Sequence, residues 1–514
     1  MHPSELILVL DFGSQYSQLI ARRVRELGVY SELRAFDVTA AEIRRLAPRG
    51  IIFSGGPSSV YDDGAPLPDP EILGLGIPVL GICYGLQIIA YQKGGAVDPG
   101  ARREFGRADV TIDDNRDLFA GFDNATTPVW MSHGDALTRL PEGFERLARS
   151  DNSPICAVRD SAGKIFGVQF HPEVVHTPRG VEILRNFAFG ICGCAGGWDS
   201  GSIIRMKTDE IRETVKKEKV LCALSGGVDS SVLAVLLHGA IGEQLYCIHI
   251  NNGVMRSSES EKIVELYRDR YHFNLKYIDA TDEFLGKLAG VVEPEQKRKV
   301  IGKVFIDVFE REARGLGGVK FLAQGTLYPD VIESTSFRGP SHTIKTHHNV
   351  GGLPERMHLK LIEPFRELFK DEVRAIGRTL HLPEHFVMRH PFPGPGLAVR
   401  IVGDVTPEKL RILRQVDDIF IGEIRKQGWY GKLWQAFAVL LPVKSVGVMG
   451  DQRTYECVAA LRAVHSTDGM TADWAPLPAE LLSAVSSRIV NEVRGINRVV
   501  YDISSKPPST IEWE

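Results

Sequence analysis

The stretch 224–231, Leu-Ser-Gly-Gly-Val-Asp-Ser-Ser, combines small residues, hydroxyls and a carboxylate in a pattern that suits phosphate chemistry. It follows the apolar run 220–224 and precedes the helical run 232–237, so it is predicted to be a tight turn between a strand and a helix. Two consecutive glycines permit positive φ, and the serine hydroxyls and helix N-terminal N–H groups can donate to an anion. The stretch predicts a phosphate cradle; the alternative is an ordinary turn in which Asp229 or Ser230 caps the helix.

The loop lacks the residues that define two familiar kinds of phosphate-binding loop. A Walker loop needs a lysine near its end to reach the terminal phosphates, and a dinucleotide fingerprint needs a third spaced glycine. The loop has neither. It carries Asp229 instead, and a carboxylate at this place suits a Mg²⁺ ion that bridges phosphate oxygens.

A second group of reactive residues follows predicted strands near the N-terminus. The strands are expected at 6–10, 50–53, 78–82 and 164–170, and the last three lead into Ser-Gly-Gly-Pro at 54–57, Gly-Ile-Cys-Tyr-Gly at 81–85 and His-Pro-Glu at 171–173. Ligands of an open α/β sheet bind beyond the carboxyl ends of its strands. These three turns are therefore expected to converge on one site.

The Gly-x-Cys-x-Gly turn has the form of a nucleophile elbow with cysteine in place of serine. A free thiol has a pKa of about 8.5 and needs an imidazole partner to be a strong nucleophile at neutral pH. His171 could supply it, Glu173 could orient the ring, and the N–H groups of Gly56 and Tyr84 could stabilise an oxyanion. Taken singly, Cys83 could be inert packing and 171–173 a plain loop; the combination favours cysteine nucleophilic catalysis.

Composition sets the class of protein. A chain of 514 residues is long enough for about three domains, and 43% hydrophobic and 25% charged residues are ordinary for a globular protein. A formal net charge of −4 argues against a chain built to grip nucleic acid or an anionic membrane. No window reaches the roughly 18 apolar residues of a membrane span, and the run 6–10 reads as a first strand rather than a signal peptide. Seven scattered cysteines make no disulfide framework, which favours a reducing cytoplasm.

Periodicity predicts two doubly wound, mostly parallel α/β domains followed by a small α+β domain. The expected ranges are 1–198, 199–396 and 397–514, with a small-residue linker at 190–203 and a rigid connector at 390–396. In the last domain strands are expected at 398–402, 436–439, 445–448 and 498–503, and helices at 407–426, 455–464 and 478–493. Its Val, Leu and Ile content suggests that it buries a face against a second copy.

Three further segments allow more than one interpretation. The basic cluster 297–299 with Lys303 could meet phosphates or form a solvated helix face. The segment 345–353 could be a lid or a surface loop, and its adjacent His347 and His348 lack a carboxylate or cysteine partner for a metal. The tail 501–514 has two prolines and a tryptophan and is expected to be docked rather than frayed.

Residues 5–195 resemble the class I glutamine amidotransferases. The resemblance implies that Cys83 is the nucleophile, His171 the base and Glu173 its orienting partner in cutting ammonia from glutamine. It also places Gln87, Ser132 and His133 at the amino-acid end of the substrate.

The loop 225–230 resembles the pyrophosphate-binding loop of the N-type ATP pyrophosphatases. Together with the amidotransferase motifs, Gly-Gly-Leu-Pro at 351–354 and the tail 506–514, it resembles the glutamine-hydrolysing GMP synthetases over the whole chain. The family resemblance implies that ATP adenylates a carbonyl oxygen of XMP with release of pyrophosphate, and that ammonia from glutamine then displaces AMP. It implies that the enzyme uses Mg²⁺ with ATP, whereas a homodimer is expected from the apolar C-terminal domain and the cytoplasm from the scattered cysteines.

The same resemblance assigns binding residues. ATP is expected to contact Ser225, Gly226, Gly227, Val228, Asp229, Ser230 and Ser231, with Asp229 also holding the metal. XMP is expected to contact Arg256, Gln452, Lys506 and Glu512. The alternatives are a tRNA-thiolating or other ligase of the ATP pyrophosphatase family, which would be expected to show a basic face and paired cysteines, and a non-catalytic nucleotide sensor.

Overall fold

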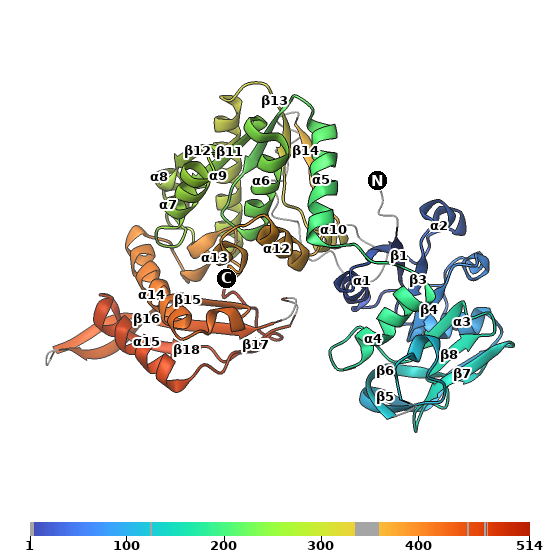
Figure 1. The fold of residues 1–514 in the computed structure, drawn as a ribbon. Coiled ribbons are helices and arrows are strands. Elements are labelled where there is room, and N and C mark those ends of the chain that lie inside the picture. Colours follow the sequence, from blue (N-terminus) through green and yellow to red (C-terminus); the bar gives the residue numbers. More distant parts are fainter. Residues whose placement is uncertain (1–4, 124–125, 335–358, 450–451, 467–468, 470) are drawn as a thin grey trace. The chain divides into compact units, whose positions relative to one another are not determined.

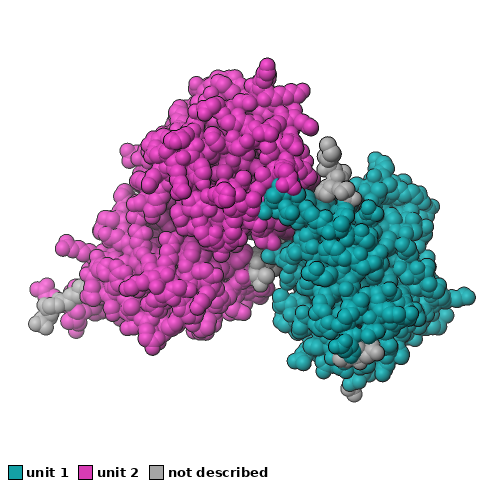
Figure 2. Space-filling view, viewed as in Figure 1, with its two compact units in different colours: residues 1–202, 335–342 teal, residues 203–334, 343–514 magenta. Residues whose placement is uncertain are grey.

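The computed structural model describes residues 5–123, 126–334, 359–449, 452–466, 469 and 471–514. The described chain divides into two compact units, residues 5–202 and residues 203–334 with 359–514 (Figure 2). The segment 345–353, with His347 and His348, and the whole of the 351–354 motif fall outside the described residues. Within the described ranges, no helix is both long and apolar enough to cross a membrane.

The first unit is built on a sheet with, among its described residues, nine strands in the order β2-β1-β3-β4-β9-β8-β7-β5-β6 (Figure 1). The strands are β1 (Leu6–Asp11), β2 (Tyr30–Ala35), β3 (Gly50–Phe53), β4 (Val79–Ile82), β5 (Ala96–Ile112), β6 (Thr126–Arg139), β7 (Phe144–Arg149), β8 (Ala157–Asp160) and β9 (Ile165–Val168). The first five in this order pair in parallel and the others antiparallel. β3, β4 and β9 are buried along their whole length, as expected for parallel strands covered on both faces.

The described helices of the first unit are α1 (Ser17–Glu26), α2 (Ala40–Leu46), α3 (Tyr84–Gln92) and α4 (Gly180–Arg185), and α5 (Ser200–Val215) leads into the second unit. Two of them, α1 and α2, connect parallel strands, whereas α3 leads from β4 into β5 and α4 follows β9. Thr39 and Glu42 form a capping box at the start of α2, which satisfies two otherwise unpaired N–H groups. The four predicted strands of this unit are confirmed, whereas the antiparallel strands β5 to β8 were not predicted.

The second unit contains an all-parallel sheet whose described strands run in the order β12-β11-β10-β13-β14. The strands are β10 (Lys219–Ala223), β11 (Leu245–Asn251), β12 (Asn274–Asp279), β13 (Val319–Ala323) and β14 (Lys360–Ile362). Helices flank it (Figure 1): α6 (Val228–Ile241), α7 (Glu259–Val264), α8 (Thr281–Leu288), α9 (Pro294–Arg314), α10 (Tyr328–Ser334), α12 (Lys370–Thr379) and α13 (Glu384–Val387). β10 lies in the middle, so the turn that follows it opens at the centre of the sheet edge.

A second sheet follows in the same unit. It contains β15 (Gln435–Met449), β16 (Gln452–His465), β17 (Asp473–Trp474) and β18 (Ile496–Tyr501), packed with α14 (Pro407–Lys426) and α15 (Ala479–Glu492). Both predicted long helices are confirmed. Two other expectations were wrong: 455–464 is strand rather than helix, and 398–400 lie in a 3-10 helix that spans Gly396–Arg400. The strands expected at 436–439, 445–448 and 498–503 are confirmed, the first two as parts of the single strand β15 and the last as β18.

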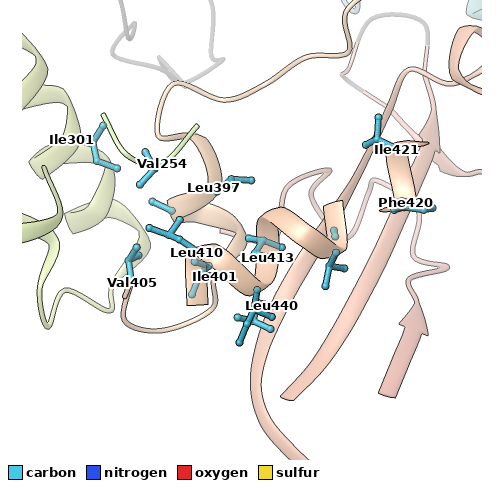
Figure 3. Packing of buried hydrophobic residues seen from close by; sticks show 14 of the residues in the cluster. Val254, Ile301, Leu397, Ile401, Val405, Leu410, Leu413, Phe420, Ile421 and Leu440 are labelled. Carbon is cyan, nitrogen blue, oxygen red and sulfur yellow. The ribbon is translucent and has the colours of Figure 1, made fainter. Parts of the chain in front are cut away.

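One apolar cluster joins the two sheets of this unit (Figure 3). It runs from Ile301 of α9 and Val254, beside the parallel sheet, through Leu397 and Leu413 to Leu440 of β15. Because this core is continuous, the loops at the edge of the parallel sheet and the C-terminal tail are held in a single body.

Candidate active sites

Cys83 lies at the junction of β4 and α3 in a strained conformation, with φ of 53° and ψ of −106°. Such a backbone is rare for a residue with a side chain and is typical of a nucleophile elbow. The turn depends on Gly85, because a Cβ at this position would lie 2.4 Å from the carbonyl oxygen of Phe53. The close approach of β3 and α3 therefore requires glycine and directs Cys83 to the carboxyl edge of the sheet.

His171 and Glu173 form a buried pair beside this thiol. Nδ1 of His171 lies 2.7 Å from Oε1 of Glu173, and both side chains are almost fully buried. Burial lowers the pKa of His171, but the charge of Glu173 and the hydrogen bond with Cys83 outweigh it and raise this pKa to about 11. A charged imidazole beside a thiol favours the thiolate, which is the nucleophilic form.

A pocket of about 540 Å³ opens at these residues and brings the predicted groups together. The predicted residues that line it are Gly56, Cys83, Tyr84, Gln87, Ser132, His133 and His171. The side-chain amide of Gln87 donates to the carbonyl oxygen of Asp135 at 2.9 Å, which ties α3 to β6. The pocket is thus walled by the ends of parallel strands on one side and by β6 on another.

The sequence did not single out several lining groups. The turn 13–16 after β1 and Phe105 of β5 line the same pocket. Glu104, next to Phe105, is buried, lies 3.1 Å from Nε2 of His133 and accepts a hydrogen bond of 2.6 Å from Ser153. The Gly-Ser-Gln-Tyr turn at a strand end was a usable signal, whereas nothing in the local sequence marks Glu104.

The predicted phosphate loop joins β10 to α6 as expected. Gly226 has φ of 76°, and a Cβ there would lie 2.2 Å from Cδ1 of Ile263, so this position requires glycine. Ser225 and Ser230 face each other across the turn with 2.9 Å between their hydroxyl oxygens. The helix starts at Val228, so its first N–H groups open toward the loop, as an anion site requires.

Two side chains that the sequence did not reveal hold the carbonyl groups of this loop. His249 of β11 donates from Nδ1 to the carbonyl oxygen of Leu224 at 2.7 Å, and burial lowers the pKa of His249, which keeps the ring neutral. Arg389 donates to the carbonyl oxygen of Gly226 at 2.7 Å and is paired with Glu259. With its carbonyls held in this way, the loop can offer N–H groups to a ligand, although that of Gly227 donates to Oγ of Ser225 at 3.3 Å.

Asp229 has the free donor atom that a metal ion needs. Its Oδ2 lies 3.3 Å from Nζ of Lys370, and its Oδ1 is buried without a hydrogen-bond partner among the described residues. No cluster of three or more His, Cys, Asp or Glu side chains that could bind a metal occurs in the described ranges. A single carboxylate fits Mg²⁺, which keeps several waters and takes its remaining ligands from substrate phosphates.

Two of the predicted XMP residues lie near each other. Nε of Arg256 is 2.8 Å from Asp417, and Glu512 pairs with Arg400 at 2.8 Å. The guanidinium groups of Arg256 and Arg400 both lie over the ring of Phe392, at 5.2 and 5.0 Å from its centroid. The structure adds a residue that the sequence missed: Gln435 donates to Glu512 at 2.6 Å.

The other two predicted XMP residues lie elsewhere. Lys506 donates to the carbonyl oxygen of Gly469 at 2.7 Å. Gln452 is exposed at the first residue of β16, whereas Arg462 of the same strand donates to Ile511 in the tail at 2.8 Å. Ten residues of strand separate the two ends, or about 33 Å at the usual rise. The structure therefore does not bring Gln452 together with Glu512.

The basic cluster and the tail meet. Lys297 is fully buried and donates to the carbonyl oxygens of Ala398 at 3.1 Å and Ile401 at 2.7 Å, and it pairs with Glu514. Arg298 donates to the backbone oxygen of Glu514 at 2.6 Å. The docked tail is confirmed. The expectation of a wholly solvated helix face was wrong for this cluster, because Lys297 is buried and pairs with Glu514.

Family models match three parts of the chain. Residues 8–191 match the model described as glutamine amidotransferase class-I, and residues 422–513 match the GMP synthase C terminal domain. Residues 218–272, which include the phosphate loop, match the tRNA methyl transferase HUP domain. The first match contains the cysteine pocket, and the third contains the loop after β10.

Curated relatives match over the full length. A GMP synthase (glutamine-hydrolysing) of Aquifex aeolicus is 60% identical over 508 residues, and those of Brachyspira hyodysenteriae and Carboxydothermus hydrogenoformans are each 58% identical over 508 residues. Each alignment covers 99% of this chain and 99% of the relative. The chain belongs to the family of glutamine-hydrolysing GMP synthases.

Proposed function

We propose that this chain is an AMP-forming carbon–nitrogen ligase that makes GMP from XMP, ATP and glutamine. The observation that carries the proposal is the 60% identity to a GMP synthase over 99% of both chains. In this proposal residues 1–198 are the glutaminase, 199–396 the ATP pyrophosphatase and 397–514 the dimerisation and XMP-contact part. A tRNA-thiolating ligase or a nucleotide sensor has no comparable full-length match among these relatives.

In the glutaminase half, Cys83 attacks the side-chain carbonyl carbon of glutamine. His171, which already carries the proton of the thiol in the ion pair with Cys83, gives this proton to the departing nitrogen, which leaves as ammonia, and water then hydrolyses the thioester. Glu173 keeps the imidazole oriented and charged, as the 2.7 Å contact and the raised pKa of His171 support. The N–H groups of Gly56 and Tyr84 stabilise the oxyanion, and Gln87, Ser132 and His133 bind the amino-acid end of the substrate.

In the synthetase half, the loop 225–231 holds the pyrophosphate part of ATP. A carbonyl oxygen of XMP attacks the α-phosphorus, pyrophosphate leaves, and ammonia then displaces AMP from the carbon to give GMP. The loop grips the leaving pyrophosphate, which accounts for the absence of a lysine aimed at a transferred γ-phosphate. Mg²⁺ held by Asp229 would neutralise charge on the phosphate oxygens.

The remaining parts of the proposal concern XMP and assembly. Arg256, Lys506 and Glu512 are proposed to contact XMP, and Gln452 stays a prediction that its place on β16 does not support. A homodimer is supported by exposed apolar side chains on the β15–β16 hairpin, where Val446 is 52%, Val448 73% and Tyr455 61% exposed. A patch of this kind usually marks an interface. The cytoplasm is the proposed compartment, and none of the seven cysteines, all in the described part of the chain, forms a disulfide.

One assay tests the function. The purified protein is mixed with XMP, ATP, Mg²⁺ and glutamine, and the nucleotides are separated by chromatography. We expect GMP, AMP and pyrophosphate in equal amounts, with one glutamate formed for each GMP. ATP consumption without GMP, or GMP formation without AMP, would overturn the proposal. Light scattering of the same sample measures the mass and tests the dimer.

A further inference from the structure

Three guanidinium groups surround the ring of Phe392 within the part of the chain that the structure describes. The carbon of each guanidinium lies 5.0 Å (Arg400), 5.2 Å (Arg256) or 5.5 Å (Arg389) from the ring centroid. The face of an aromatic ring carries partial negative charge and attracts cations at this range. Three like charges around one ring would otherwise repel each other, so the ring and their separate anionic partners keep them in place.

Each of these arginines is tied to a different part of the second unit. Arg389 donates to the carbonyl oxygen of Gly226 in the phosphate loop. Arg256 is paired with Asp417 of α14. Arg400, whose side chain is fully buried, is paired with Glu512 of the tail. Phe392 is therefore a common support for the loop proposed to hold ATP and for the residues proposed to hold XMP.

The segment that carries Phe392 is itself held firmly. His390 accepts a hydrogen bond at Nδ1 from the N–H of Ala436 at 3.2 Å and donates from Nε2 to the carbonyl oxygen of Tyr430 at 2.9 Å. Gln435 donates to the carbonyl oxygen of Pro391 at 3.1 Å. The prolines at 391, 393 and 395 restrict the backbone further. The segment that carries the ring is therefore anchored by β15 and by Tyr430.

We propose that Phe392 is a positioning residue that couples the geometry of the phosphate loop to that of the XMP-contact residues through its three arginines. This inference rests on the proposed synthesis of GMP. An aliphatic side chain of similar volume fills the space but lacks the charged face, so the three guanidinium groups lose a shared support. Arg389 then holds Gly226 less firmly, Arg256 turns away from its proposed position at XMP, and Arg400 holds Glu512, another proposed XMP contact, less firmly.

The test compares Phe392→Leu with wild type, with ammonia in place of glutamine so that only the synthetase half is measured. We expect KM for ATP and KM for XMP each to rise about three- to tenfold, as loss of a cation–aromatic contact predicts. Phe392→Tyr keeps the ring face and should restore both constants to near the wild-type values. The thermal midpoints of Phe392→Leu and Phe392→Tyr report whether the second unit is folded, and glutamine hydrolysis, measured alone, reports on the first unit.

Phe437→Leu is the matched control. The guanidinium of Arg400 lies 4.2 Å from the centroid of Phe437, and neither Arg256 nor Arg389 has a cation–aromatic contact with this ring among the described residues. This variant should raise KM for XMP and leave KM for ATP unchanged. The coupling would be overturned if Phe392→Leu raised only one of the two constants, or if Phe392→Tyr were as impaired as the leucine variant. Wild-type protein that forms no GMP would instead overturn the proposed function.

Discussion

Nδ1 of His171 lies 2.7 Å from Oε1 of Glu173 in a site where both side chains are almost completely removed from water. A carboxylate that is buried beside an imidazole stabilises the protonated ring more strongly than the same pair would in solvent. This pair therefore sets the pH range in which the imidazole of His171 stays protonated beside Cys83.

The alkaline limit of glutamine hydrolysis should depend on Glu173. A group whose pKa is raised, here to about 11, keeps its proton as pH rises and loses it only near that value. Glu173→Gln removes the charge but keeps the shape, so the alkaline limb of kcat/KM for glutamine should move down by about 1 to 3 pH units. Glu182→Gln, in an exposed pair with Arg179, should keep the wild-type profile. An unchanged alkaline limb in Glu173→Gln would contradict the role of the charge.

Cys83→Ala should separate the two halves of the reaction. Without a thiol there is no thioester, so GMP formation from glutamine should fall to the background rate, at least about a thousandfold below wild type. GMP formation from ammonium chloride should stay within about twofold, because the loop 225–231 belongs to the other compact unit. Cys156→Ala removes a buried thiol outside the pocket and serves as the control. Loss of both activities in Cys83→Ala would disprove this division.

Asp229→Asn should abolish synthesis with either nitrogen source. The amide has nearly the same shape but no charge for a cation, and Oδ1 of Asp229 is the buried oxygen that lacks a partner among the described residues. Calorimetric titration of the variant with Mg²⁺ and ATP should show binding weakened by at least about tenfold. Hydrolysis of glutamine alone should persist. Full activity of Asp229→Asn would exclude the metal role.

The sequence predicted those parts of the sites that lie at the ends of parallel strands. Cys83, His171 and the loop 225–231 each follow an apolar run, and parallel strands end at one edge, so position in the sequence was enough to place them together. Glu104 and Arg389 could not be found in this way. Glu104 comes from an antiparallel strand with no motif, and Arg389 reaches Gly226 from 163 residues further along the chain.

Contacts between distant parts of the chain also explain the wrong predictions in the second unit. The run Cys-Val-Ala-Ala-Leu-Arg-Ala-Val at 457–464 is rich in good helix formers, yet β15 and β18 pair with it on both edges and make it a strand. Lys297 stands in a charged run that reads as surface, but its partners Ala398 and Glu514 lie more than 100 residues away. In both cases the structure depends on contacts between residues far apart in the sequence, and a local sequence pattern carries no information about such contacts.

Gly85→Ala should destabilise the first unit. The added Cβ would lie 2.4 Å from the carbonyl oxygen of Phe53, and backbone atoms of a central strand cannot move aside cheaply. We expect a loss of about 1 to 3 kcal/mol in the free energy of unfolding, measured by urea denaturation, together with loss of glutamine hydrolysis. Gly74→Ala is the control, since a Cβ there meets nothing within 4 Å and should change stability by less than about 0.5 kcal/mol.

Glu512→Ala should reveal how strongly the tail holds the second unit. Arg400 is fully buried, and its pair with Glu512 neutralises its charge. Removing the carboxylate leaves a buried cation without its counterion, which costs about 3 to 5 kcal/mol. The urea midpoint of the second unit should therefore fall clearly. KM for XMP should rise because Glu512 is itself a proposed XMP contact, and because Arg400 shares the ring of Phe392 with Arg256.

An exposed pair in the same unit gives the comparison for this change. Arg488 and Glu492 form an i,i+4 pair on α15 with side chains 41% and 49% exposed. Water and salt screen such exposed pairs, so they contribute little to stability, and Glu492→Ala should leave the urea midpoint almost unchanged. Two variants with equal midpoints would mean that Arg400 finds another partner or water when Glu512 is lost. In that case the tail would be bound through Arg462, which donates to three of its carbonyl oxygens, those of Ser504, Thr510 and Ile511.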